Sequence, residues 1–476
     1  MKKLLTPTLF LVLFATGAFS QSKDIQQKIS AVESHLSGWI RTQNDHDWTL
    51  QERMKRYHLK GLSIAVINDY KIEWAKGYGW ADSSEGRPVT TATLFQAASI
   101  SKSLNGVGVM RLVQDGKLNL DADVNQYLKS WKFSYDSLSK GKKITMAELL
   151  SHTAGLSVHG FGGYDVDDSL PSITQILDGK RPANNPPVRA MFAPGIRSVY
   201  SGGGITLSQL VVMDITGLPY DRYMQDSVLN PLGMTSSFYT APAPSGKKAV
   251  LATGYRGNGT PLHGKYHIYP EQAAASLWTN PTDLARYIIA TQRSLEGKAG
   301  GPLSPGMTKQ RLTPYVDSNA ALGVFIQQKG DDKYFSHGGA NEGFRSQYFG
   351  SLHNGRGVVV MVNSDNGAIM NEIINSVATV YKWEGFYKPV VKTEIDAPAS
   401  LEQYAGRYAI SNDTARIIQK DGKLYVEVEF EKLQLHFTTA DEFFLYDQQA
   451  DFRFTRENGQ VAGILINNQQ TFKKID

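Results

Sequence analysis

Stretches with the alternating polarity of β-strands lie near both ends of the region 61–363, and helical patterns fill most of the space between them. The first stretch covers Gly61–Asp82, and the others follow at 321–328, 334–337, 344–351 and 357–363. Strands and helices bury their apolar faces only against one another. The pattern therefore predicts an α/β (α+β) fold with one antiparallel sheet that is built from both ends of the region, covered by helices, with an inserted helical lobe.

Several segments have the apolar spacing of helices. Ile29, Val32, Leu36 and Ile40 predict an amphipathic helix within 24–58. Further helices are expected at 104–113, 144–150, 206–216, 281–293 and 368–382, with Thr279 or Asn280 as the N-cap of the 281–293 helix.

The last part of the chain has purely β character. Residues 386–400 contain two prolines and little periodicity, which is typical of a linker. Beyond them, Asp421-Gly422 and Asn458-Gly459 each separate two strand-like runs, and such dipeptides are strong hairpin signals. We predict a separate β-barrel domain at 401–476, after a main domain at 21–385.

The first twenty residues have the three parts of a secretory signal. Lys2 and Lys3 precede an apolar stretch at Leu9–Ala15, and Ala18-Phe19-Ser20 forms a small-x-small cleavage site. We expect a signal peptide at 1–20 and a periplasmic or secreted protein; a retained N-terminal anchor is the alternative. No other run reaches the length of a membrane span, so none is expected after the signal is removed. The chain has no cysteine, which excludes disulfides, thiolate chemistry and lipidation at cysteine.

The charge distribution and the motifs limit which partners, cofactors and metals this chain is expected to bind. The net charge of +5 is spread thinly, with no Lys/Arg block, so no nucleic-acid partner is expected. No phosphate-binding loop, Gly-x-Ser-x-Gly elbow or His-Glu-x-x-His helix occurs, and no cofactor is predicted. His263 and His267 lack a third ligand, and the acidic residues at 165–168 fit a solvated loop, so no metal site is predicted. The oligomeric state is left open.

One serine and lysine pair has the setting of a catalytic group. Ser-x-x-Lys occurs five times, but only Ser99 and Lys102 follow an apolar approach, Leu94-Phe95, and open a helix that we expect to be amphipathic. Helical spacing places their β-carbons about 5–6 Å apart on one face. The helix N-terminus favours an oxyanion. A hydroxyl beside an amine can act as an activated nucleophile in catalysis. The alternative interpretation of the pair is a helix-capping serine and a surface lysine.

Two later motifs complete the set in a fixed order. Tyr200-Ser201-Gly202 precedes a glycine run, and His337-Gly338-Gly339 is predicted to end a short strand. Alone, they would be a half-buried tyrosine and a turn histidine. Together with Ser99 they supply the activating groups and close backbone approach that a serine acyltransferase or hydrolase needs.

At this point the chain resembles a known family. Further landmarks over residues 30–385 are Leu94-Phe95-Gln96, the segment 149–156, Asn230–Met234 and Thr282–Ala285. With the three motifs, they resemble the serine β-lactamase and penicillin-binding-protein superfamily, in the branch of class C β-lactamases, D-stereospecific aminopeptidases and related esterases. The C-terminal β segment is similar to the lipocalin-like domains appended to such enzymes.

The resemblance implies a role for each matching residue. Ser99 would be the nucleophile, Lys102 its activating partner and Tyr200 the proton shuttle. The backbone amides of Ser99 and Ala340 would form the oxyanion hole, with Gly339 beside them on the strand that the substrate approaches.

Two positions depart from the family pattern. Gly202 stands where many relatives have an asparagine that binds a substrate amide, and His337 stands where the lactamases have lysine. By resemblance, His337 would bind a substrate carboxylate or tune Tyr200, and we expect activity to follow its titration between about pH 5 and 8.

These departures favour some substrates over others. We expect an exported serine hydrolase that forms an acyl-enzyme from a small-molecule ester, amide or peptide, as an esterase or D-amino-acid peptidase does. The alternatives are a true class C-like β-lactamase or DD-peptidase, an acyl transferase or cyclase, and a non-catalytic protein that binds cell-wall fragments.

Overall fold

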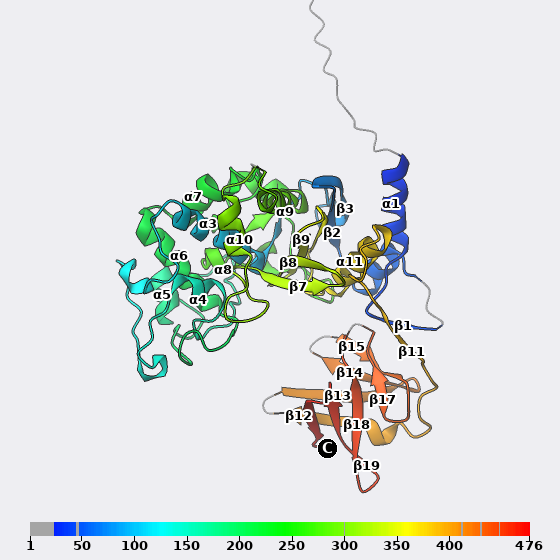
Figure 1. Cartoon of the computed structure of the whole chain (residues 1–476). Coiled ribbons are helices and arrows are strands. Elements are labelled where there is room, and N and C mark those ends of the chain that lie inside the picture. The colour runs from blue at the N-terminus through cyan, green and yellow to red at the C-terminus, as the bar shows by residue number, and fades with distance from the viewer. Residues whose placement is uncertain (1–22, 44–46, 299, 411–412, 429–430, 447) are drawn as a thin grey trace, which may run out of the picture.

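The computed structural model describes residues 23–43, 47–298, 300–410, 413–428, 431–446 and 448–476 (Figure 1). The predicted signal peptide at 1–20 lies outside these ranges. Within them, no helix combines the length and apolarity that a membrane crossing requires.

A seven-stranded antiparallel sheet forms the centre of the main domain. In spatial order its strands are β4 (Arg87–Pro88), β3 (Lys71–Asp82), β2 (Gly61–Asn68), β10 (Gly357–Val362), β9 (Phe344–Ser351), β8 (Asp332–Asn341) and β7 (Phe325–Lys329). Central strand β2 pairs with β10, with Ile64 opposite Val360. The sheet is therefore built from both ends of the domain, as the sequence predicted.

Helices cover both faces of this sheet. Because successive side chains of a strand point to opposite faces, Val358 and Val360 of β10 contribute to one core, and Val359 and Met361 to the other. The first face carries the layer of α1 (Lys23–Ser34), α2 (Leu50–Arg56) and α11 (Ala368–Val380), and the second is covered by α9 (Pro281–Leu295) (Figure 1). Asn280 caps α9 by accepting a hydrogen bond from the Asp283 amide, as expected.

The remaining helices form the inserted lobe, on the left of Figure 1. They are α3 (Ser101–Gln114), α4 (Met146–Leu150), α5 (Ile173–Asp178), α6 (Gly202–Thr216), α7 (Tyr220–Met224), α8 (Gln272–Ala275) and α10 (Pro305–Arg311). β5 (Phe95–Gln96) and β6 (Trp278–Thr279) form a two-stranded sheet, and β5 comes shortly before Ser99 in the chain. Short helical turns are η1 (Ala98–Ile100), η2 (Val124–Gln126), η3 (Ser137–Ser139), η4 (Gln225–Leu229), η5 (Ser245–Val250), η6 (His263–Lys265) and η7 (Glu402–Tyr404).

Three expectations about local structure were wrong. The predicted 24–58 helix is two helices separated by β1 (Ile40–Thr42), and Leu36 instead pairs with Trp48 in a β-bridge. Helix α3 is not amphipathic, because the lobe surrounds it and buries every residue from its start to Met110. His337-Gly338-Gly339 does not end a strand, because β8 continues to Asn341 and keeps its pairing with β9.

The C-terminal segment forms a nine-stranded antiparallel barrel-like sheet (Figure 1). Its strands in spatial order are β15 (Glu431–Gln434), β14 (Lys423–Val428), β13 (Asp413–Lys420), β12 (Gly406–Ile410), β20 (Gln470–Lys474), β19 (Gln460–Ile466), β18 (Phe452–Glu457), β17 (Glu442–Phe444) and β16 (His436–Phe437). Asp421-Gly422 and Asn458-Gly459 form the two predicted hairpin turns, each with two positive φ angles. The segment predicted as a linker contains β11 (Val390–Lys392), which pairs in parallel with β1.

Candidate active site

Ser99 lies in the turn η1, directly before α3. The preceding residue, Ala98, has φ 49°, a conformation that costs a non-glycine residue about 1–3 kcal/mol. Ser101 holds the turn in place, because its hydroxyl donates to the Ala98 carbonyl at 2.5 Å and accepts from the Leu277 amide at 3.0 Å. The strained turn leaves the Ser99 side chain partly exposed while its neighbours are buried.

Lys102 is buried beside this serine. Its Nζ donates to Ser99 Oγ at 2.9 Å and to the Ala274 carbonyl of α8 at 2.8 Å. Among the described residues, no carboxylate forms an ion pair with it. The amine therefore has two fixed acceptors, one of which is the candidate nucleophile, and the predicted placement of the pair on one face is correct.

Tyr200 lies over the amine within a group of rings. Lys102 Nζ is 5.0 Å from the centroid of the Tyr200 ring, and the His152 and His159 rings lie 4.3 and 5.0 Å from it. Phe325 of β7 is stacked on the same ring at 6.4 Å. His152 Nδ1 accepts a hydrogen bond from the Ser201 amide at 3.2 Å, which places the histidine proton on Nε2.

His337 faces this group from β8 as a neutral imidazole. Its ring centroid is 6.2 Å from that of Tyr200, and its Nδ1 lies 2.6 Å from the Gly338 carbonyl, an acceptor, so Nδ1 carries the proton. Nε2 is buried and has no hydrogen-bond partner among the described residues. Burial, and then the charge of Lys102, lower the pKa of His337 to about 3.

The expected titration of His337 near neutrality is therefore wrong. The ring is 4% exposed, and a buried charge next to an ammonium group is unfavourable. For the same reasons, burial first and Lys102 second, the pKa of His152 lies well below its ordinary value. A neutral His337 cannot bind a substrate carboxylate as a cation, but its Nε2 can accept a hydrogen bond.

This protonation state predicts how acid affects stability. Between pH 6.5 and 3 the unfolded chain binds a proton at residue 337 that the folded chain excludes, so stability falls as the pH falls. From pH 6.5 to 5, His337 alone should remove about 2 kcal/mol from the free energy of unfolding. We expect the free energy of unfolding of His337→Asn, measured in urea titrations, to fall by about 2 kcal/mol less than that of the wild type between pH 6.5 and 5. Equal losses in the two proteins would contradict the assignment.

The strand that carries His337 reaches the nucleophile through a glycine. A Cβ on Gly339 would lie 2.1 Å from the Ala97 carbonyl and 2.3 Å from Ser346 Oγ, so only glycine lets β8 pass η1 this closely. Ala340, the next residue, is exposed. The structure thus brings the segment proposed for the oxyanion hole next to the Ser99 turn.

Gly202 starts α6, and a loop occupies the space beside it. Its amide donates to the His159 carbonyl at 2.9 Å, and an added Cβ would lie 3.0 Å from that oxygen and from the Phe161 ring. The place of the family's asparagine side chain is therefore filled from the loop after residue 158.

Sequence reasoning missed the groups that pack around the core of the site. These are His152, His159, Phe161, Phe325 and the Ala274 carbonyl. His152 falls within the landmark at 149–156, but no spacing indicates that its ring contacts a tyrosine 48 residues later.

His263 and His267 each pair with one residue of the acidic loop. His263 Nε2 lies 3.0 Å from Asp167, and His267 Nε2 lies 3.2 Å from Asp165. In the part of the chain that the structure describes, no group of three or more His, Asp or Glu side chains is arranged to hold a metal ion.

Comparisons with known proteins agree with this geometry. The family model described as Beta-lactamase matches residues 47–378. Protein flp of Staphylococcus aureus (strain MRSA252) is 24% identical over 340 residues, which is 68% of this chain and 63% of that protein, so the chain spans less than two thirds of its relative.

Solved structures show the same fold. An octameric penicillin-binding protein homologue from Pyrococcus abyssi has a TM-score of 0.63 at 20% identity, covering 89% of this chain and 97% of that one. D-amino acid amidase from Ochrobactrum anthropi SV3, complexed with L-phenylalanine, has a TM-score of 0.58 at 20% identity, covering 75% and 98%. The family model matches most of the length of this chain, and the solved structures share its fold. The chain therefore belongs to the Beta-lactamase family.

Proposed function

We propose that this protein is a serine hydrolase that forms an acyl-enzyme on Ser99 from esters and amides that carry no carboxylate, as an esterase or D-amino-acid amide hydrolase does. The observation that carries the proposal is the 2.9 Å hydrogen bond between buried Lys102 Nζ and the partly exposed Ser99 Oγ. A binding protein that only kept the fold would have no need to bury an amine against that hydroxyl.

The chemistry follows from the order of the groups. Ser99 Oγ attacks the carbonyl carbon, and its proton passes to Tyr200, which acts as the base, while the Lys102 ammonium holds Ser99 Oγ in place. The carbonyl oxygen becomes an oxyanion that the Ser99 and Ala340 amides would bind. The proton then goes to the leaving group as the carbonyl–leaving-group bond breaks, and water releases the acyl group by the same steps.

Electrostatics supports the choice of substrate class. A β-lactam or a peptide C-terminus brings a carboxylate, which needs a cation in the pocket. His337 is neutral at physiological pH, and Lys102 is already engaged with Ser99 and Ala274. Among the described side chains that pack around Tyr200, Lys102 is the single cation. Acyl groups without a carboxylate therefore suit the pocket, and the amidase named above makes D-aminoacyl amides a reasonable choice to test.

The proposal is tested by following acylation and turnover together. We expect p-nitrophenyl acetate to add an acetyl mass to the peptide that contains Ser99, and the Ser99→Ala variant to lose both the label and turnover. Nitrocefin should be hydrolysed at least about a hundredfold more slowly than the best neutral ester or D-aminoacyl anilide, the loss expected when a charged group has no partner.

Each outcome has a clear meaning. Ser245→Ala serves as a matched control, because Ser245 begins η5 in another Ser-x-x-Lys segment and is exposed; it should keep the label on Ser99. Label or turnover that persists in Ser99→Ala would refute the proposal. Nitrocefin as the best substrate would restore the β-lactamase alternative.

A further inference from the structure

The buried side chain of Arg311 lies against α3, the helix that carries Lys102. Arg311 ends α10 and is 0% exposed. Its Nη2 donates to the Tyr287 hydroxyl at 3.1 Å, and its Nη1 donates to the Ser103 carbonyl of α3 at 3.4 Å. Nε is buried and has no acceptor, and no carboxylate of the described residues pairs with the guanidinium.

An arginine in this position carries an uncompensated charge. The guanidinium stays protonated in proteins, and a buried charge is stable only when it is paired and hydrogen-bonded. The chain's other fully enclosed arginine follows this rule, because Arg53 is 4% exposed and binds Glu372 through Nε at 2.7 Å. Arg311 has neutral partners instead, which are the Ser103 carbonyl, the Tyr287 hydroxyl and the face of the Tyr287 ring, 5.6 Å from its Cζ, and no negative partner lies among the described residues.

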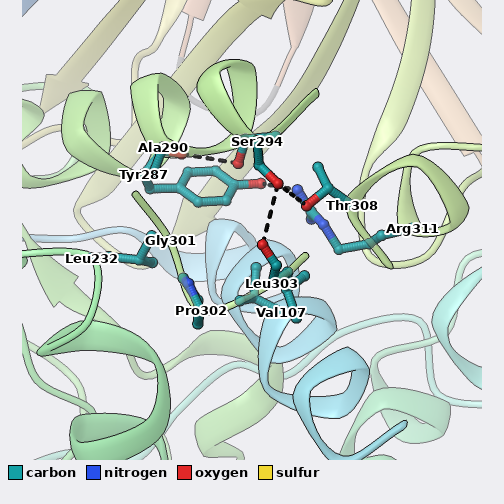
Figure 2. A pocket seen from close by; sticks show the side chains of 11 residues that line it. Val107, Leu232, Tyr287, Ala290, Ser294, Gly301, Pro302, Leu303, Thr308 and Arg311 are labelled. Carbon is teal, nitrogen blue, oxygen red and sulfur yellow. Dashed lines mark hydrogen bonds between the residues drawn. The ribbon is translucent and has the colours of Figure 1, made fainter. Parts of the chain in front are cut away.

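A small cavity adjoins the guanidinium. Its free volume is about 20 Å³, enough for one group of the size of a water molecule. Figure 2 shows Arg311, Tyr287, Ser294 and Thr308 turning their polar ends toward one another at its edge. Ser294 Oγ donates to the Leu303 carbonyl at 3.2 Å and lies 2.8 Å from Thr308 Oγ1, so the Thr308 hydroxyl is the one that can rotate to donate to an occupant.

We propose that this cavity binds one small monovalent anion, chloride, against the Arg311 guanidinium. A water molecule would satisfy the free Nε–H but would leave the charge uncompensated, whereas a halide does both. The apolar walls, which include Val107, Leu232 and Leu303, exclude larger oxyanions.

The position of the cavity indicates which helices a bound chloride would stabilise. Its walls come from α3, α9, α10, the segment 301–303 and Leu232. The Ser103 carbonyl that Arg311 binds follows Lys102 directly in the chain. Chloride therefore stabilises the packing of α10 and α9 on the helix that carries the catalytic amine, and its effect is expected in stability rather than in the reaction itself.

Unfolding in matched salts gives the first test. The full-length protein, prepared without chloride, is unfolded by urea in sodium gluconate and in sodium chloride at equal ionic strength and pH. A ligand that binds only the folded state at ten times its dissociation constant raises the folded-to-unfolded ratio about tenfold. We expect a saturable increase of this kind in chloride. Arg311→Met should lose it, and the control Arg53→Met should keep it.

Bromide in crystals of the unaltered protein gives the second test, which does not depend on any variant folding. An anomalous peak within contact of Arg311 Nε supports the proposal. Density without anomalous signal at that point in concentrated bromide identifies water and overturns it. Equal stability in chloride and gluconate, or a chloride response that survives in Arg311→Met, overturns it as well.

Discussion

Lys102→Met is expected to lower kcat for ester hydrolysis by about a thousandfold, because the proton transfer from Ser99 that Lys102 supports contributes about 10²–10⁴. Methionine keeps the length and apolar stem of the side chain but removes the donor that contacts Ser99 Oγ and the Ala274 carbonyl. Substrate binding should change little. Steady-state and burst kinetics with p-nitrophenyl acetate would then place the loss in kcat, with a KM within a fewfold of the wild type.

The chain offers a matched control for this change. Lys329 is half-buried, with its Nζ over the Trp39 and Phe386 rings, and lies at the far end of β7 from Phe325. Lys329→Met should keep kcat while it alters stability. A Lys102→Met enzyme with more than a tenth of wild-type kcat would show that another group activates Ser99.

Glu271→Gln is expected to change the pH dependence of stability strongly. Glu271 precedes α8, is 0% exposed, and its carboxylate accepts no hydrogen bond from another described residue. Burial raises its pKa to about 8. From pH 4.5 to 8 the unfolded chain releases a proton that the folded chain keeps, so the wild type loses stability as the pH rises.

The size of this loss follows from the shift. A rise in pKa from 4.5 to about 8 corresponds to roughly 4 kcal/mol by pH 8, as an upper value. The glutamine side chain of the variant would have no charge to bury, so the variant's stability relative to the wild type should grow by that amount between pH 4.5 and 8. Urea titrations across this range measure the difference.

An exposed carboxyl is the control. Glu296 is paired with Lys298, which lowers its pKa, so Glu296→Gln should give no gain at high pH. A constant difference between Glu271→Gln and the wild type across the range would mean that Glu271 is ionised in the folded protein.

The sequence predicted the parts of the site whose relation is local or recorded in a motif. Ser99 and Lys102 are one helical turn apart, so spacing alone placed the amine beside the hydroxyl. The order of the three motifs, with the family resemblance, indicated that Tyr200 and His337 would join them. The hairpins at 421–422 and 458–459 were also predictable, because only two residues determine such a turn.

What the sequence could not predict depends on burial. The charge of His337 is decided by the lobe that encloses it and by the nearby ammonium, and neither can be derived from the residues next to it in the chain. The helix expected at 24–58 failed because Leu36 pairs with Trp48 across a loop, a tertiary contact that outweighs local propensity. Arg311 gave no signal at all, since only the packing of α10 on α3 and α9 shows that it lacks an acid.

The pairing of β2 with β10 has a consequence for how the protein is made. A ribosome releases the chain from its N-terminus, and Ile64 must wait for Val360, about 300 residues later, so this contact closes a very long loop. Until then β2 presents one unpaired edge of buried-type residues, which is prone to wrong association. Nascent chains that stop before residue 357 lack β10 and cannot form its pairing with β2. The C-terminal barrel is synthesised after β10, so it is complete only once this pairing can form.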